Sequence, residues 1–510
     1  YELQLRIRTE MHLRAGRRSE VLDRGTQADI AAAFGYKDSD GASALSAFMR
    51  DYLLAAREVN GLLRTLVSRF RYLRRIQHGM AARVGRRVLE RDFVAVGDRI
   101  FLGRNDLFDG PGGLRNMMRI FLCSQRHRLE VSEEALQHIR HQLHRVDDAF
   151  RQDPEVAAML MEILRGASGV ADTLQAMAES GLLGEYLPEF GELDCLVHYE
   201  AYHDYTVDEH TLMSIRTIDE LSSADSELDR PKREILAQVT RPCLLKLALL
   251  LHDIGKPRGS EHTERGATMI PLIAKQLSLP EPDGKLVMFL VENHLAMADL
   301  SQRRDFNEEG VLKGFAAKVG NLNQLQMLYL MTYADIKSVG RGAWAVWKDS
   351  LLWELYEKTA ALLSKAPRTD EAAETDFRHA LLSILPKSIT REEAERHCDR
   401  VPPRYAVEVT PEEAVAHLRL IQRLKDEPMT VSFSFTDAYA EMWLCTGDMP
   451  ARFSQIAGTF VGNGVNIISA QAFTRKDGII LDRFRLSDAG GKVVTDTEFW
   501  EKVKSDLSDV

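Results

Sequence analysis

A histidine, an aspartate and a lysine lie close together at the end of an apolar run, in the stretch "LLHDIGK" (residues 250–256). His252, Asp253 and Lys256 are each costly to bury unless they are paired or coordinate a metal ion. Adjacent helix positions differ by about 100° in azimuth, so the histidine and aspartate can converge on an ion but cannot enclose it. The motif therefore predicts a metal site that other elements complete.

Further candidate ligands fall within one block of helical pattern, residues 206–365. They are His210 in "VDEHTL", His262 in "EHTERGA", His294 in "ENHLAM" and Asp335 in "TYADIK". Any one of these histidines alone would more often be a structural or surface residue than a ligand. The ordered set, with a lysine beside the central pair, favours a helical bundle whose inner faces present metal ligands.

Mixed imidazole and carboxylate ligands suit Mn²⁺, Mg²⁺, Fe or Zn and do not choose among them. Of these we expect Mn²⁺ or Mg²⁺, as one ion or two. If two ions bind, Asp253 is the expected bridge, because a carboxylate has two oxygens to share. Such a site lowers the pKa of bound water and binds a phosphoryl oxygen, and Lys256 would offer the phosphate a point charge. The predicted reaction is metal-assisted hydrolysis of a phosphate ester, with Asp253 and Lys256 as catalytic residues.

The composition is that of an ordinary soluble protein, with 45% hydrophobic and 28% charged residues. The length of 510 residues is enough for three or four domains. The net charge of −10 argues against nucleic-acid binding. No apolar run is long enough to span a bilayer, so we expect no membrane association. The five cysteines form no CxxC pair, which suits a reducing cytoplasm; they are Cys123, Cys195, Cys243, Cys398 and Cys445.

The periodicity predicts a mainly α protein that ends in a small α+β domain. Residues 1–190 are expected to be helical, with a hairpin near 92–103, and residues 191–365 to form the metal-binding domain. A polar linker at 364–375 and a helical connector over 366–425 should follow.

From residue 426 the pattern alternates, and the strands and helices follow the β-α-β-β-α order of a ferredoxin-like sheet backed by two helices. A further strand after the last helix would complete this sheet. Because an unpaired edge is a liability, we expect the domain of residues 426–510 to be truncated.

The ligand pattern resembles the HD-type metal-dependent phosphohydrolase superfamily. That resemblance implies that His210, His252, Asp253 and Asp335 are its four defining ligands. His262 and His294 would match the second-metal positions, although relatives often have a double histidine where this chain has Asn293-His294.

Longer strings resemble the bifunctional PII uridylyltransferase/uridylyl-removing enzymes of bacterial nitrogen regulation, over essentially the whole chain. They include "MHLRAGRRSEVLDRGTQADIAAAFGY" (11–36), "YHDYTVDEHTL" (202–212), "LSQRRD" (300–305) and "LYLMTYADIKSVGRGAWAVWKDSLLWELY" (328–356). The resemblance implies removal of UMP from uridylylated PII signal protein. In this reaction Arg303 and Arg304 could hold UMP or the PII loop. Alternatively, at least one of these arginines forms a surface ion pair. We find no Gly-rich loop with paired aspartates ahead of this helical extension, so we expect the transferase centre to be absent from this chain.

The C-terminal sheet resembles an ACT domain, which implies glutamine as an effector. The candidate ligand residues are Asp448, Asn463, Gly464 and Asn466, the last three in "GNGVNIISAQAFT" (462–474). The family's Asp-x-Pro-Gly-Leu reads "DMPARF" here (448–453), so a packing module without a ligand remains open.

Two alternative functions remain. One is a guanosine-tetraphosphate hydrolase, against which the run Lys256-Pro257-Arg258 argues, since that family usually has acidic residues there. The other is a non-catalytic regulatory module that binds metal, which the complete ligand set disfavours.

Overall fold

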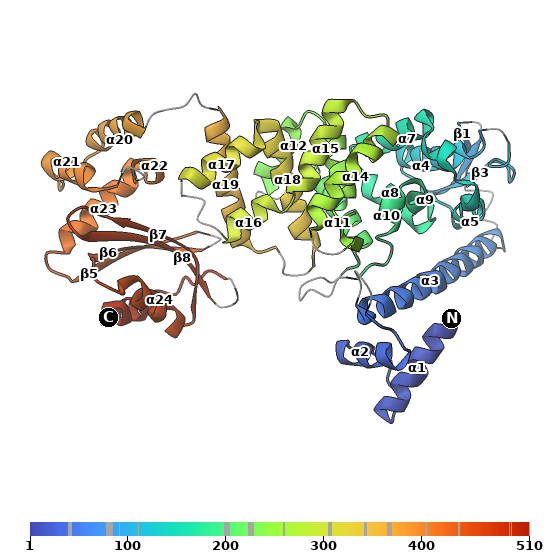
Figure 1. The fold of residues 1–510 in the computed structure, drawn as a ribbon, viewed down its shortest axis with the longest axis horizontal. Coiled ribbons are helices and arrows are strands. Elements are labelled where there is room, and N and C mark those ends of the chain that lie inside the picture. Colours follow the sequence, from blue (N-terminus) through green and yellow to red (C-terminus); the bar gives the residue numbers. More distant parts are fainter. Residues whose placement is uncertain are drawn as a thin grey trace. The chain divides into compact units, whose positions relative to one another are not determined.

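The computed structural model describes residues 1–38, 43–77, 85–90, 92–110, 112–197, 205–222, 229–258, 261–303, 309–340, 344–364, 370–402, 405–436, 439–488, 490 and 492–508. The chain divides into two compact units (Figure 1). Unit 1 comprises residues 1–298 and 323–343, and unit 2 comprises residues 299–322 and 344–510.

Unit 1 begins with three helices, α1 (Glu2–Ala15), α2 (Arg24–Ala33) and α3 (Ala44–Gln77), around a small core that contains Ile7, Ile30 and Phe48. The long helix α3 is joined to the rest of the unit by an arginine. The guanidinium of Arg57 donates a hydrogen bond of 2.7 Å to Asp208, in the first turn of the helix that carries His210.

A small sheet follows, in the order β1 (Arg86–Leu89), β2 (Phe93–Val96), β3 (Arg99–Leu102), β4 (Glu130–Val131). The predicted hairpin is confirmed: β2 and β3 pair antiparallel, and Gly97 adopts a φ of 65°, as a two-residue hairpin turn requires. The sequence did not predict β1 or β4: β4 has only two residues, and in β1 only Leu89 is buried, so neither shows a buried and exposed alternation.

The remainder of unit 1 is helical, as predicted, and α13 lies at its centre, packed against α7, α11 and α15. All residues of α13 from Cys243 to Leu251 are buried, which explains its apolar sequence. The elements after the sheet are α4 (Arg115–His127), α5 (Glu133–Gln142), η2 (Leu143–Arg145), α6 (Asp148–Arg151), α7 (Pro154–Arg165), α8 (Val170–Glu179), α9 (Leu182–Tyr186), α10 (Pro188–Gly191), α11 (Val207–Leu221), α12 (Arg230–Gln238), α13 (Pro242–Leu251), η4 (Lys256–Arg258), α14 (His262–Gln276), α15 (Glu281–Asn293), α16 (Ala296–Arg303, which ends in unit 2) and α18 (Leu322–Ser338). Among the described helices, none combines the length and the apolar composition needed to cross a membrane.

Lys246 interrupts the apolar run of α13 because it makes a buried ion pair. Its Nζ donates to Asp219 Oδ1 at 2.7 Å and to the carbonyl of Gly166 at 2.9 Å. Asp219, on α11, accepts a further hydrogen bond from the backbone N–H of Ala171 in the first turn of α8. This pair therefore joins α13, α11 and α8, and it sets the position of α13.

Unit 2 contains a four-stranded antiparallel sheet in the order β5 (Met429–Phe435), β6 (Ala440–Gly447), β8 (Ile479–Asp488), β7 (Val465–Thr474). Helices cover both of its faces (Figure 1). Trp443 and Leu481 pack against α20–α23, whereas Met442 and Phe484 pack against α24 and α25. The helices of this unit are α17 (Glu309–Val319), α19 (Val346–Ser364), α20 (Asp370–Ser383), α21 (Arg391–Arg400), α22 (Tyr405–Glu408), α23 (Pro411–Arg423), α24 (Arg452–Gly462) and α25 (Thr497–Ser508).

The fold class, mainly α with a small α+β domain, is confirmed, and two details of the sequence interpretation are corrected. Residues 370–375 were predicted as linker but belong to α20, whose Phe377 and Leu381 are buried in the core; residues 365–369 lie outside the described residues. The sequence predicts a further strand after the last helix to complete the sheet, but in the structure β5, which precedes β6 in the chain, pairs with β6. The domain boundaries remain predictions.

Replacement of Lys246 by Met should destabilise the protein, because it leaves the buried Asp219 without its cation. We expect the free energy of unfolding to fall by about 3–5 kcal/mol, the usual cost of removing one partner of a buried pair. The double variant Lys246→Met/Asp219→Asn should recover most of that loss, because it removes both charges and keeps an acceptor for Ala171. Urea unfolding measures both effects, and a loss below about 1 kcal/mol in the single variant would show that the pair is not structural.

Unit 2 should lose stability in acid because it buries two neutral histidines. His397 Nε2 and His417 Nδ1 lie 2.9 and 2.5 Å from the Tyr405 hydroxyl. Burial lowers the pKa of both histidines to about 3. The charge of Arg475 adds to this effect at His397, and His397 adds to it at His417. An unfolded histidine titrates near 6.5, so the unfolded state binds more protons between pH 6.5 and 3. The contribution is complete above pH 6.5 and is lost as the pH falls toward 3.

We expect the urea midpoint to decrease between pH 7 and pH 4.5, because the free energy of unfolding falls by about 1 kcal/mol per histidine and pH unit at the acid end. The variant His417→Asn keeps a polar partner for Tyr405 but cannot titrate, so its midpoint should depend less on pH. An equal pH dependence in both proteins would contradict this assignment.

Candidate metal centre

The six predicted ligands come together in unit 1, and the ends of helices supply most of them. His252 and His294 lie at the C-caps of α13 and α15, and Asp253 follows directly in the turn after α13. His262 is the first residue of α14, and His210 lies in the first turn of α11. Asp335 lies on α18.

The donor atoms form two adjacent groups, in each of which they lie within 4.8 Å of one another. In the first group, Asp335 Oδ1 lies 2.9 Å from His210 Nε2 and 3.7 Å from His252 Nε2. The second group contains Asp253, His262 and His294, with 3.8 Å between Asp253 Oδ1 and His262 Nε2.

Asp253 lies between the two groups. Its Oδ2 is 3.3 Å from His252 Nε2 and 3.9 Å from His210 Nε2, whereas its Oδ1 faces His262. The rings of His252 and His294 are also neighbours, with centroids 5.1 Å apart. One carboxylate therefore contacts both groups, which is the arrangement expected of a bridging ligand.

Hydrogen bonds to the backbone fix the tautomer of two of the histidines. His252 Nδ1 lies 2.7 Å from the carbonyl of Leu249, and His294 Nδ1 lies 2.8 Å from that of Val291. A carbonyl only accepts, so each Nδ1 carries a hydrogen and each Nε2 is the nitrogen left for the centre. This is how metal-binding histidines are usually held.

The donor set fits a divalent cation. His252 Nε2 and Asp253 Oδ1 are buried and, among the described residues, have no hydrogen-bond partner. Imidazole nitrogens face carboxylate oxygens here, an arrangement that a positive charge between them, a proton or a metal cation, stabilises. Buried polar atoms without partners are rare in folded proteins, and a bound ion satisfies such atoms.

The electrostatics of the centre also favour a cation. Burial raises the pKa of Asp253, but His252 and Lys256 outweigh it and hold this pKa well below its usual value. Burial likewise raises the pKa of Asp335, and His210 and His252 hold it well below normal. For His252, burial lowers the pKa, but Asp253 and Asp335 raise it to about 10. The two carboxylates thus stay ionised and draw positive charge into the centre.

The centre opens to solvent on one side. The side chains of His252 and Asp253 are 1% exposed, whereas those of Lys256 and His262 are 16% and 24% exposed. Lys256 Nζ lies 2.6 Å from Asp253 Oδ2, so it adds a positive charge at this opening. A phosphate that entered here would meet the ammonium group beside the second group of ligands.

Gly255 explains how His262 comes close to Asp253. A Cβ at this position would lie 2.0 Å from the carbonyl oxygen of His262 and 2.9 Å from the backbone nitrogen of Gly266. The turn after α13 therefore packs directly against the first turn of α14, and only glycine allows this approach.

Two hydroxyl groups that the sequence did not reveal also contact the ligands. Thr332 Oγ1 donates to the carbonyl of Leu328 and lies 3.3 Å from that of His294, which joins α18 to the end of α15. Ser338 Oγ lies 3.1 Å from His210 Nδ1. The i, i+3 spacing of Asp335 and Ser338 on a helix is the only sequence signal that pointed to such a contact.

The remaining predicted residues do not join the centre in the described structure. Arg303 ends α16, and its side chain and all of Arg304 lie outside what the structure describes. The residues predicted to bind glutamine lie in unit 2, at opposite ends of the β7–β8 hairpin. Asp448 lies beside Gly478 in the hairpin turn, whereas Asn463, Gly464 and Asn466 lie where β7 begins. Their roles remain predictions.

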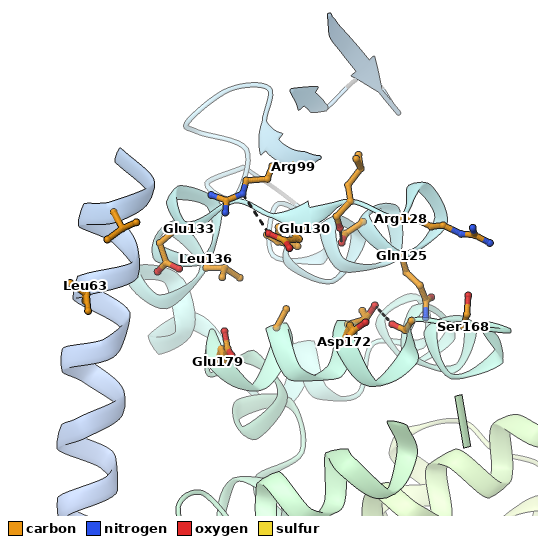
Figure 2. A pocket seen from close by; sticks show the side chains of 17 residues that line it. Leu63, Arg99, Gln125, Arg128, Glu130, Glu133, Leu136, Ser168, Asp172 and Glu179 are labelled. Atoms are coloured by element: carbon orange, nitrogen blue, oxygen red, sulfur yellow. Dashed lines mark hydrogen bonds and ion pairs between the residues drawn. The ribbon is translucent and has the colours of Figure 1, made fainter. Parts of the chain in front are cut away.

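A cavity of about 1040 Å³ lies elsewhere in unit 1, between α3, α5 and α8 (Figure 2). Three of its acidic side chains are in ion pairs: Glu130 with Arg99, Glu133 with Arg140, and Asp172 with Arg216. None of the six predicted ligands lines it, and we assign it no ligand.

Three family models match the chain. They are described as GlnD PII-uridylyltransferase (residues 1–67), uridylyltransferase GlnD third domain (93–186) and HD domain (207–322). The chain belongs to the GlnD uridylyltransferase family. The HD-domain match includes five of the six candidate ligands, and Asp335 follows it in the chain.

Curated relatives agree with this assignment. The chain is 30% identical over 504 residues to a bifunctional uridylyltransferase/uridylyl-removing enzyme from Nitrobacter winogradskyi. The aligned region covers 94% of this chain and 53% of that relative. A relative of the same name from Azospirillum brasilense is 30% identical over 506 residues, which are 95% of this chain and 53% of the relative. Another, from Bradyrhizobium sp. strain ORS 278, is 29% identical over 510 residues, which are 94% of this chain and 53% of the relative. This chain of the GlnD family thus spans about half the length of the relatives it matches.

Replacement of Gly255 by Ala should weaken metal binding at the second group of ligands. The added methyl forces α14 away from the turn and separates His262 from Asp253. If the wild type binds two Mn²⁺ ions, we expect the variant to bind one fewer per chain. If the wild type binds one, we expect the affinity for Mn²⁺ to fall by about 10–100-fold. Gly458→Ala, where an added Cβ meets open space within α24, is the control for a methyl group. Equal Mn²⁺ binding by Gly255→Ala and wild type in equilibrium dialysis would contradict the role of this contact.

Proposed function

We propose that this centre hydrolyses the phosphodiester that links UMP to a tyrosine of PII signal protein, in the cytoplasm. The observation that carries the proposal is the pair of adjacent ligand groups that share the Asp253 carboxylate beside Lys256. The family assignment supports the substrate, because the matched relatives are named as uridylyl-removing enzymes. The free cysteines of the described chain suit a reducing compartment.

In this proposal, His210, His252 and Asp335 hold one divalent cation, and Asp253 with His262 and His294 can hold a second. A bound cation supplies Lewis acidity toward a phosphoryl oxygen and lowers the pKa of water. Mn²⁺ or Mg²⁺ is the proposed ion; Fe and Zn suit the same donors.

The residues of the chain have separate tasks in this reaction. Lys256 is held as an ammonium by Asp253 and attracts the phosphate of the substrate to the open side of the centre. The Nδ1 hydrogen bonds of His252 and His294 keep these rings oriented while the substrate binds. Water forms the new bond to phosphorus, the bond from phosphorus to the tyrosine oxygen breaks, and UMP and a free tyrosine hydroxyl are released. With a pKa near 10, the tyrosine oxygen is a good leaving group.

The α+β domain of unit 2 is the proposed place of regulation, with glutamine as its effector. Its sheet and two helices have the architecture expected of a small-molecule sensor, and glutamine binding to it remains part of this proposal.

The proposal predicts Mn²⁺-dependent release of UMP from uridylylated PII by this chain. Asp253→Asn keeps the volume of the side chain but removes the shared charge, so the rate should fall by more than about 100-fold, since even outer-shell partners of metal ligands cost 10–100-fold. Asp172→Asn, an exposed aspartate in unit 1, is the matched control and should keep the wild-type rate. Release is measured by chromatography of free UMP.

A rate that is unchanged in Asp253→Asn would contradict the proposed role of the centre. If a metal-loaded wild-type chain releases no UMP but hydrolyses guanosine tetraphosphate, the substrate assignment is wrong and the chemistry of the centre stands.

A further inference from the structure

A serine hydroxyl contacts His210 on the side of the ring that faces away from the carboxylates. Ser338 Oγ lies 3.1 Å from His210 Nδ1 and 2.8 Å from the backbone carbonyl oxygen of Asp335. Ser338 is 3% exposed and ends α18. Its hydroxyl therefore contacts two ligand residues of the same group at a position that is closed to solvent.

A hydroxyl has one hydrogen to donate and can also accept, so Ser338 can serve either tautomer of His210. If His210 Nδ1 carries the ring hydrogen, it donates to Ser338 Oγ, and Ser338 donates to the carbonyl of Asp335. If Nε2 carries the hydrogen, Nε2 donates to Asp335 Oδ1 at 2.9 Å, and Ser338 donates to Nδ1. His210 Nδ1 has the Ser338 hydroxyl as its partner in both arrangements.

This property separates His210 from two other histidines of the centre. His252 and His294 place Nδ1 against backbone carbonyls, which accept only, so a hydrogen stays on each Nδ1. His210 has a partner that works in both directions. It can therefore bond Asp335 directly when no cation is present and can release Nε2 when a cation binds.

We propose that Ser338 is a positioning residue of the metal centre, whose hydroxyl lets His210 move its ring proton from Nε2 to Nδ1 as a divalent cation binds. The ring stays neutral in this step: Nε2 loses a proton, Nδ1 gains one, and the hydroxyl turns from Nδ1 to the Asp335 carbonyl. The inference rests on the proposed metal site.

Loss of the hydroxyl should affect the metal-loaded state more than the metal-free state. In a Ser338→Ala variant without metal, the ring keeps its bond from Nε2 to Asp335, and Nδ1 loses only the hydroxyl that donates to its lone pair. With metal bound, the same variant removes the hydroxyl that accepts from the Nδ1 hydrogen, and loss of an acceptor by a buried N–H is the more costly defect.

The test is Mn²⁺ binding to the full chain by titration calorimetry. Ser338→Ala should raise the Kd by about 10–100-fold, the range found for outer-shell partners of metal ligands, and Ser338→Thr, which keeps the hydroxyl, should restore most of the affinity. Ser214→Ala is the matched control: Ser214 is fully buried on α11, and its hydroxyl donates to the carbonyl of Thr211 with the same i, i−3 geometry. This control should bind Mn²⁺ as tightly as the wild type.

A second readout does not depend on any variant of Ser338. Ring ¹⁵N spectra of the histidine-labelled wild type should show the proton of His210 on Nε2 without metal and on Nδ1 with Zn²⁺; a His210→Gln variant assigns the signal. A His210 ring that is protonated on Nδ1 before metal is added would overturn the inference, as would equal Mn²⁺ affinity in wild type and Ser338→Ala. If the wild type binds no divalent cation, the proposed function fails, and the serine inference fails with it.

Discussion

The Asp253 side chain is 1% exposed and that of Asp335 is 14% exposed, yet their environment keeps both carboxylates ionised. An isolated charge at such a depth would be neutralised by a shift of its pKa, so compensating positive charge is a requirement of the fold. Lys256 and the histidines supply part of it. The rest of the compensating charge must come from a cation that both imidazole nitrogens and carboxylate oxygens can coordinate. The helices of unit 1 are arranged to meet that need at one point.

The ends of helices perform most of this positioning. The last carbonyls of a helix have no partner within it, and in α13 and α15 such carbonyls accept the Nδ1 hydrogens of His252 and His294. The ligands thereby take their orientation from rigid backbone. The helix α13 is itself buried, and the ion pair of Lys246 with Asp219 joins it to α11, which carries His210. The ion pair thus joins the helix that carries His210 to the helix that ends at His252.

The sequence was informative where residue type and local spacing carry the information. The order of histidines and aspartates indicated one helical centre, and alternation indicated the strands of unit 2. It could not reveal contacts that depend on how distant helices cross: Ser338 and His210 are 128 positions apart. The packing of Gly255 against α14 and the pairing of β5 with β6 were hidden for the same reason. A strand can be predicted from its own residues, but the edge at which it pairs is set by the whole domain.

The central claim is that the buried histidines and carboxylates exist to hold a divalent cation. Anomalous diffraction from crystals of the chain soaked with Mn²⁺ tests it most directly. The account predicts an anomalous peak within coordination distance of His210 Nε2, His252 Nε2 and an oxygen of Asp335, with any second peak on the far side of Asp253. The absence of a peak at saturating Mn²⁺, with His210 and His252 hydrogen-bonded directly to the carboxylates, would contradict it.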